Sequence, residues 1–98
     1  MLSNKKKKLD LVQRILKQAV EMSSNNIIDV FVDWSSHVEL FTVKVYLDGW
    51  KPDNEADYRK DVWCKTYGDE LCIKELEEIL KYLKGVKQNE INRQVNCV

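Results

Sequence analysis

The 98-residue sequence has few residues that interrupt secondary structure, with only three Gly and one Pro. It also lacks an excess of either charge, because 16 Lys and Arg balance 16 Asp and Glu. No apolar run approaches the roughly 20 residues that span a membrane. The neutral total argues against binding of nucleic acid or membrane by overall attraction. With 44% hydrophobic residues, the chain is expected to form one small domain with a real core.

Signals for export are also missing. Basic residues near the N-terminus are not followed by the apolar stretch of a signal peptide, because Asp10 and Arg14 interrupt it. The three cysteines, Cys64, Cys72 and Cys97, are an odd number, which favours reduced thiols over a disulfide framework. We therefore expect a cytoplasmic protein.

Patterns typical of catalysis, metal binding and cofactor binding are absent from the sequence. The cysteines and the single histidine, His37, lack the close spacing of structural zinc ligands. The acidic segment after Asp53 fails as a calcium loop, because Tyr58 stands where the loop needs Gly and Cys64 where it needs Glu. The isolated glycines cannot form a phosphate-binding loop. We expect no enzyme activity, no metal and no cofactor.

Two segments have the periodicity of amphipathic helices. The first covers residues 4–22, although its four lysines oppose the helix dipole and favour an ordered start nearer Leu9. The second begins at Asp69, a good N-cap, and is expected to stop at Gly85. The domain is therefore expected to cover residues 1–86, followed by a polar C-terminal tail over 87–98 that either frays or continues as a weak helix.

Between the helices, the alternation of apolar residues predicts three strands over residues 27–34, 38–47 and 61–67. If Trp34 lies opposite His37, then Val30 lies opposite Phe41, and the apolar sides of both strands share one face. Residues 48–57 form the clearest loop, with Gly, Pro, Asn and three Asp. The order α-β-β-β-α predicts an α+β fold, a three-stranded antiparallel sheet with two helices packed on one face.

The element order over residues 5–85 resembles the topology of the double-stranded-RNA-binding domain. That family places basic residues at the start of its final helix to meet phosphates. This chain has Gly68, Asp69 and Glu70 there, which would repel phosphate. The resemblance therefore implies a similar element order and no RNA-binding residues.

The second face of the predicted hairpin is more apolar than solvent requires. Ile27, Phe31, Leu40 and Tyr46 point to it, and the adjoining loop adds Trp50. Either a partner covers this face, or the long loop over residues 48–61 folds back on it, or the core lies on both faces of the sheet. Carboxylates frame the face, and residues 21–58 carry eight acids and only two lysines. The predicted partner-binding residues are Phe31, Leu40, Tyr46, Trp50, Asp29, Asp33 and Asp48.

These features predict a non-catalytic accessory or inhibitor protein that binds another protein or itself through an acidic and aromatic face. A ring of carboxylates would suit a basic groove on a partner. The alternative is a nucleic-acid-associated accessory protein that uses the basic N-terminal residues Lys5, Lys6, Lys7 and Lys8.

The sequence as a whole resembles the short accessory proteins of phages and prophages in low-GC bacteria. The resemblance is carried by the segment from Val38 to Trp50, which ends in Tyr46-Leu47-Asp48-Gly49-Trp50. A composition of 13 Lys to 3 Arg with seven Asn suits an AT-rich genome. The resemblance implies a phage origin and no particular activity.

Overall fold

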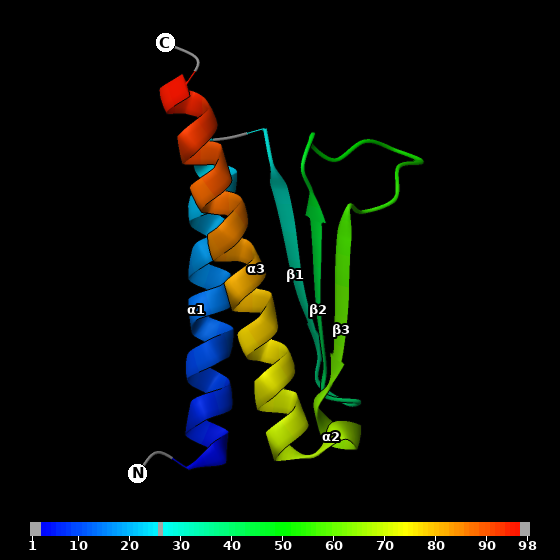
Figure 1. Ribbon diagram of the computed structural model, residues 1–98. Coiled ribbons are helices and arrows are strands. Elements are labelled where there is room, and N and C mark those ends of the chain that lie inside the picture. The colour runs from blue at the N-terminus through cyan, green and yellow to red at the C-terminus, as the bar shows by residue number, and fades with distance from the viewer. Residues whose placement is uncertain (1–2, 26, 97–98) are drawn as a thin grey trace.

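The computed structural model describes residues 3–25 and 27–96 (Figure 1). Its elements are α1 (Asn4–Asn25), β1 (Asp29–Ser35), β2 (Leu40–Tyr46), β3 (Tyr58–Trp63), α2 (Cys64–Tyr67) and α3 (Asp69–Asn96). The strands form one antiparallel sheet in the order β1-β2-β3. α1 and α3 run side by side in the same direction and cover one face of the sheet, which confirms the predicted α+β fold.

The hydrophobic core lies between the helical layer and the sheet. Every second residue of β2 is directed into it, so that Phe41, Val43 and Val45 are 1% exposed or less. The apolar stripes of both helices close the core from the other side, with Ile15 and Met22 from α1 and Leu76, Ile79 and Leu83 from α3. Neither helix could bury its apolar stripe alone, so each helix packs against both the sheet and the other helix.

The predicted hairpin register is wrong, although the predicted core side is right. Trp34 lies opposite Phe41 and not His37, and every β1 residue pairs four positions later than predicted. The connection is a four-residue turn over 36–39, in which Glu39 adopts a φ of +50°. Ser-Ser is a poor type I′ pair, and the wider turn brings Val32 opposite Val43. Because the shift is an even number of residues, the same side chains still face the core.

The first helix begins earlier than the lysine run suggested. Ser3 caps it, because the Ser3 Oγ accepts a hydrogen bond from the Lys6 backbone N–H at 3.2 Å. The Lys8 Nζ contacts the Asp69 carboxylate at 2.7 Å, which offsets part of the repulsion between the lysines and the helix dipole. The helix therefore starts at Asn4 and not near Leu9.

The third strand is displaced toward the N-terminus relative to its prediction. Tyr58 and Lys60 belong to it because both contact α3: Tyr58 stacks on Tyr82 with ring centroids 3.8 Å apart, and Lys60 pairs with Glu75. Residues 64–67, predicted as strand, form the short helix α2. Gly68 then joins α2 to α3 with a φ of +77°, a conformation that favours glycine.

The second long helix does not stop at Gly85, since α3 continues to Asn96. Packing explains the continuation, because Val86 lies against the core and the Lys87 Nζ contacts Glu21 of α1 at 2.9 Å. Residues 87–96, predicted as a polar tail, are therefore helical in the structure.

Replacing Gly85 with alanine is expected to stabilise the protein by about 0.5–1 kcal/mol, because glycine in a helix interior loses more conformational freedom on folding. A Cβ at this position would meet no atom within 4 Å. Urea unfolding followed by circular dichroism measures the change. A loss of stability would contradict a continuous helix, because it would place Gly85 in the left-handed conformation of a helix end.

Two ion pairs join α1 to α3 near the two ends of α1. The hydrogen bond from Lys87 lowers the pKa of Glu21 below its ordinary 4.5, and the hydrogen bond from Lys8 lowers the pKa of Asp69 below 3.8. A carboxyl group whose pKa is lower in the folded state stabilises the fold at pH values above its ordinary pKa. This stabilisation is lost as the pH falls through the lowered pKa. We therefore expect the free energy of unfolding to decrease when the pH is lowered below about 4.5.

The matched variant for this pH dependence is Lys87→Met, which removes the partner of Glu21 and keeps an aliphatic side chain. Its acid-side loss of stability should be shallower than that of the unchanged protein in urea titrations. Equal slopes in the two proteins would show that the Glu21–Lys87 pair does not link stability to pH.

Candidate partner-binding face

The sheet presents one uncovered face, since both long helices lie on the other side (Figure 1). We call this the outer face. Its side chains, together with that of Trp50, surround a shallow hollow of about 550 Å³. The outer-face residues that line the hollow are Phe31, Asp33, Leu40, Thr42, Lys44, Tyr46 and Arg59. Of the predicted partner-binding residues, the hollow unites Phe31, Leu40, Tyr46, Trp50 and Asp33.

Two aromatic rings of the outer face contact each other. Phe31 of β1 and Tyr46 of β2 meet edge to face, with centroids 5.5 Å apart and planes at 87°. Phe31 is 46% exposed, whereas Tyr46 is only 8% exposed. Tyr46 therefore supports the ring of Phe31 from beneath, and Phe31 is the ring of this pair that solvent or a partner can reach.

The start of the long loop borders the outer face without covering it. The Trp50 backbone N–H donates a 2.7 Å hydrogen bond to Asp29 Oδ2, and the Leu47 N–H donates one of the same length to Asp57 Oδ2. Gly49, with a φ of +89°, passes so close to β1 that a Cβ there would lie 3.2 Å from the Ile27 carbonyl oxygen. These contacts hold Trp50 at the margin of the hollow, still 53% exposed.

The charges of the outer face differ from the predicted ring of carboxylates. Asp33 and Asp48 are exposed, but Asp29 is used to hold the loop. Lys44 and Arg59 add positive charge to the lining of the hollow, and neither is among the predicted partner-binding residues. Arg59 lies on the face because β3 begins at Tyr58, and the three consecutive charged residues 59–61 gave no apolar alternation that could have indicated this start.

On β3, the Asp61 carboxylate contacts two neighbouring side chains. It accepts a 3.0 Å hydrogen bond from Thr42 Oγ1 and contacts the Arg59 Nε at 3.4 Å. Asp33 is therefore the exposed carboxylate in the lining of the hollow, whereas Asp48 lies in the turn after β2. The face combines apolar rings, an exposed carboxylate and two cationic side chains.

The basic residues of the alternative interpretation lie elsewhere, in the first two turns of α1. Lys5, Lys6 and Lys7 are exposed, whereas Lys8 is held by Asp69. The acidic start of α3, Asp69 and Glu70, lies beside this basic segment. The four lysines contribute nothing to the outer face.

The remaining candidate groups, His37 and the cysteines, form no metal site in the described part of the chain. His37 is exposed in the turn of the hairpin. Within residues 3–25 and 27–96, no group of three or more His, Cys, Asp or Glu could hold a metal ion. The predicted tail thiol, Cys97, lies outside the described residues.

Comparison of the chain with family models, with curated proteins and with solved structures gave no match. In the part of the chain that the structure describes, no helix is long and apolar enough to cross a membrane.

Proposed function

We propose that this chain is a non-catalytic, protein-binding accessory protein that acts through the outer face of its sheet. One observation carries the proposal: the outer face is free of helices and presents a hollow lined by Phe31, Tyr46 and Trp50. Phe31 and Trp50 remain about half exposed, so the face has apolar surface to bury on binding. Aromatic side chains of this kind contribute strongly to protein interfaces.

The charge of the outer face favours a protein partner over a nucleic acid. Lys44 and Arg59 are its two cations, and the Arg59 side chain is already paired with Asp61. Asp33 is exposed in the lining of the hollow and would repel phosphates. The alternative function through Lys5, Lys6, Lys7 and Lys8 has no comparable support, because Lys8 is paired and acidic residues lie beside it.

The partner that we propose is a second copy of the chain. The face carries exposed groups of both signs, so the carboxylate of Asp33 on one copy can meet Lys44 or Arg59 on the other. A face with charges of both signs is complementary to a second copy of itself. It is less complementary to a basic groove on a partner, which an inhibitor would need. Strands of about six residues at a spacing of about 4.8 Å offer a few hundred Å² per copy, which is typical of weak association.

The proposal includes a cytoplasmic location and the accessory type of role that the phage-like sequence implies. Cys64 and Cys72 both carry free thiols, which suits a reducing compartment.

Light scattering coupled to size-exclusion chromatography tests the proposed function directly. The purified chain should show a mean mass that rises from one copy toward two between about 10 μM and 1 mM, the range of weak association. A monomer throughout this range would overturn the proposed self-association. The same measurement at raised salt should show a smaller mass if charges of opposite sign meet across the interface.

A further inference from the structure

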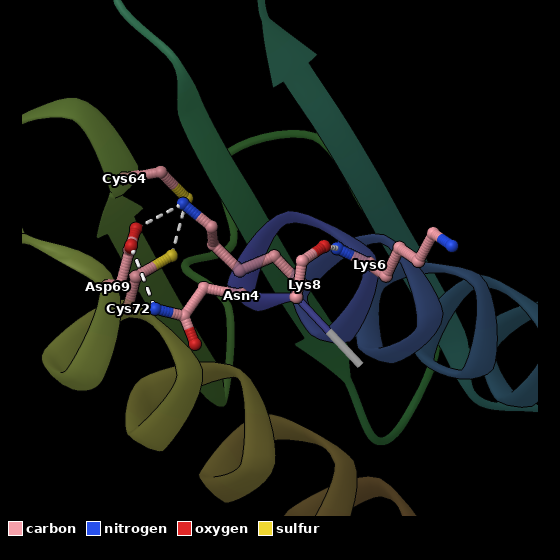
Figure 2. A network of polar contacts seen from close by, with 7 residues as sticks. Asn4, Lys6, Lys8, Cys64, Asp69 and Cys72 are labelled. Atoms are coloured by element: carbon pink, nitrogen blue, oxygen red, sulfur yellow. Dashed lines mark hydrogen bonds and ion pairs between the residues drawn. The ribbon is translucent and has the colours of Figure 1, made fainter. Parts of the chain in front are cut away.

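Away from the outer face, two cysteine side chains meet where α2 joins α3. The Cys72 thiol donates a hydrogen bond to the Cys64 sulfur, and the two sulfur atoms are 2.9 Å apart (Figure 2). Cys64 begins α2 and is half-buried, whereas Cys72 lies in α3 and is fully buried. The positive φ of Gly68 makes the turn that brings the two helix starts together.

The sulfur pair lies beside a cationic side chain. The Lys8 amine points toward the cysteines and forms its 2.7 Å contact with Asp69, which is anchored in turn by Asn4 (Figure 2). Figure 2 also shows that Lys6, two residues earlier, points away from the sulfur atoms. A positive charge near a thiol favours the thiolate, which is the reactive form of cysteine.

A hollow of about 420 Å³ gives access to the sulfur pair from one side. Cys64 lines it and Cys72 does not. Its walls include the apolar side chains of Leu9 and Trp34. Its charged groups are the amines of Lys5 and Lys8 and the carboxylate of Glu39, which leaves one more positive than negative group. A small molecule with carboxylates and an apolar or sulfur-containing centre would therefore reach Cys64 first.

We infer that Cys64 and Cys72 form a redox-active dithiol that is oxidised to an intramolecular disulfide by a low-molecular-weight disulfide bearing carboxylates. The Cys64 thiolate attacks one sulfur of that molecule, which breaks its disulfide bond, forms a mixed disulfide and releases one thiolate. This thiolate takes up the proton that Cys64 has lost. The Cys72 sulfur then attacks Cys64 Sγ, releasing the second thiolate, which takes the Cys72 proton. The oxidant leaves as two thiols and the protein has lost two hydrogens.

The order of the two steps follows from the surroundings of each sulfur. Burial, followed by the hydrogen bond to Cys64, raises the pKa of Cys72 to about 12, so this thiol keeps its proton at neutral pH. Cys64 alone faces the hollow. Cys64 is therefore the attacking residue and Cys72 the resolving residue. The sulfurs need to approach by only about 1 Å to reach the bonded distance of about 2.0 Å.

The test uses the full chain with Cys97→Ser, so that only the paired cysteines react. The protein is incubated with glutathione disulfide, quenched with an alkylating agent and examined by intact and peptide mass spectrometry. We expect a product lighter by two hydrogens, with Cys64 linked to Cys72 and no alkylation of either residue. Two alkylated thiols in the native protein after this treatment would overturn the proposal.

Two single variants separate the roles of the cysteines in the same background. Cys72→Ser should accumulate one glutathione on Cys64, because no second sulfur can resolve the mixed disulfide. Cys64→Ser should leave Cys72 as a free thiol in the folded protein. The opposite pattern, with glutathione on Cys72 only, would overturn the assigned order of attack.

The contribution of the amine is tested by Lys8→Gln, with Lys6→Gln as the matched control that points away from the sulfurs. Lys8→Gln should slow formation of the mixed disulfide in the Cys72→Ser background by about threefold or more, because it removes the nearby positive charge. Lys6→Gln should leave the rate unchanged. Equal rates for both variants would contradict activation by Lys8.

Discussion

Replacing Phe31 with alanine is expected to weaken self-association of the chain by about 30-fold or more, equivalent to about 2 kcal/mol. The reason is that Phe31 lies in the hollow of the outer face and is its exposed ring on β1. In a symmetric dimer the residue is lost from both copies, so the effect counts twice. Sedimentation equilibrium or light scattering over a dilution series measures the change in dissociation constant.

The matched control for Phe31→Ala is Leu16→Ala. Leu16 is 50% exposed, close to the 46% of Phe31, but it lies on α1 in the helical layer. Loss of exposed apolar area alone would affect both variants, whereas loss of the outer face affects only Phe31→Ala. Equal weakening by the two substitutions would contradict an interface on the sheet. Tyr46 is a poorer probe, because at 8% exposure its truncation would also disturb packing.

Replacing Phe41 with alanine is expected to destabilise the fold by about 3–5 kcal/mol. Phe41 is 1% exposed and lies in the core between β2 and the helices, so the truncation leaves a cavity that the surroundings fill only in part. A domain of this size is stable by about 5–15 kcal/mol, so the loss is a large share of the total. Urea unfolding at a concentration where the protein is monomeric measures it.

Phe31→Ala is also the control for Phe41→Ala, since the same residue type is truncated on the opposite face of the sheet. Its effect on the stability of the monomer should stay below about 1 kcal/mol because the ring is already half exposed. The two variants should thus separate folding from association. A large loss of monomer stability in Phe31→Ala would mean that the outer face is part of the core.

The arrangement of layers could be predicted from the sequence because apolar periodicity determines which side of each element is buried. The stripe of α3 and the alternation in β2 both lead to residues that are fully buried, such as Leu76 and Val43. Element ends were less predictable, because tertiary contacts decide them. The ion pair between Lys87 and Glu21 stabilises the part of α3 that continues beyond Gly85. The stacking of Tyr58 on Tyr82 makes β3 begin earlier in the sequence than predicted.

The candidate face was predictable in its apolar residues and not in its charges. The alternation of side chains along each strand places Phe31, Leu40 and Tyr46 on one side of the sheet. The error in the predicted register does not change this side, because the error is an even number of residues. The presence of Arg59 required the correct strand β3, and the engagement of Asp29 required the path of the loop. The contact between Cys64 and Cys72 depends on the turn at Gly68. The separation of the two cysteines in the sequence does not predict this contact.

The most direct test of the central claim, that the outer face is the surface used for association, is a dilution series followed by nuclear magnetic resonance. Backbone amide shifts of Phe31, Lys44 and Arg59 should change progressively as the concentration falls from about 1 mM to about 10 μM. The shifts of exposed α1 residues such as Leu16 should stay constant. Shifts that are independent of concentration at the outer face, or that change on α1 and α3 instead, would contradict it.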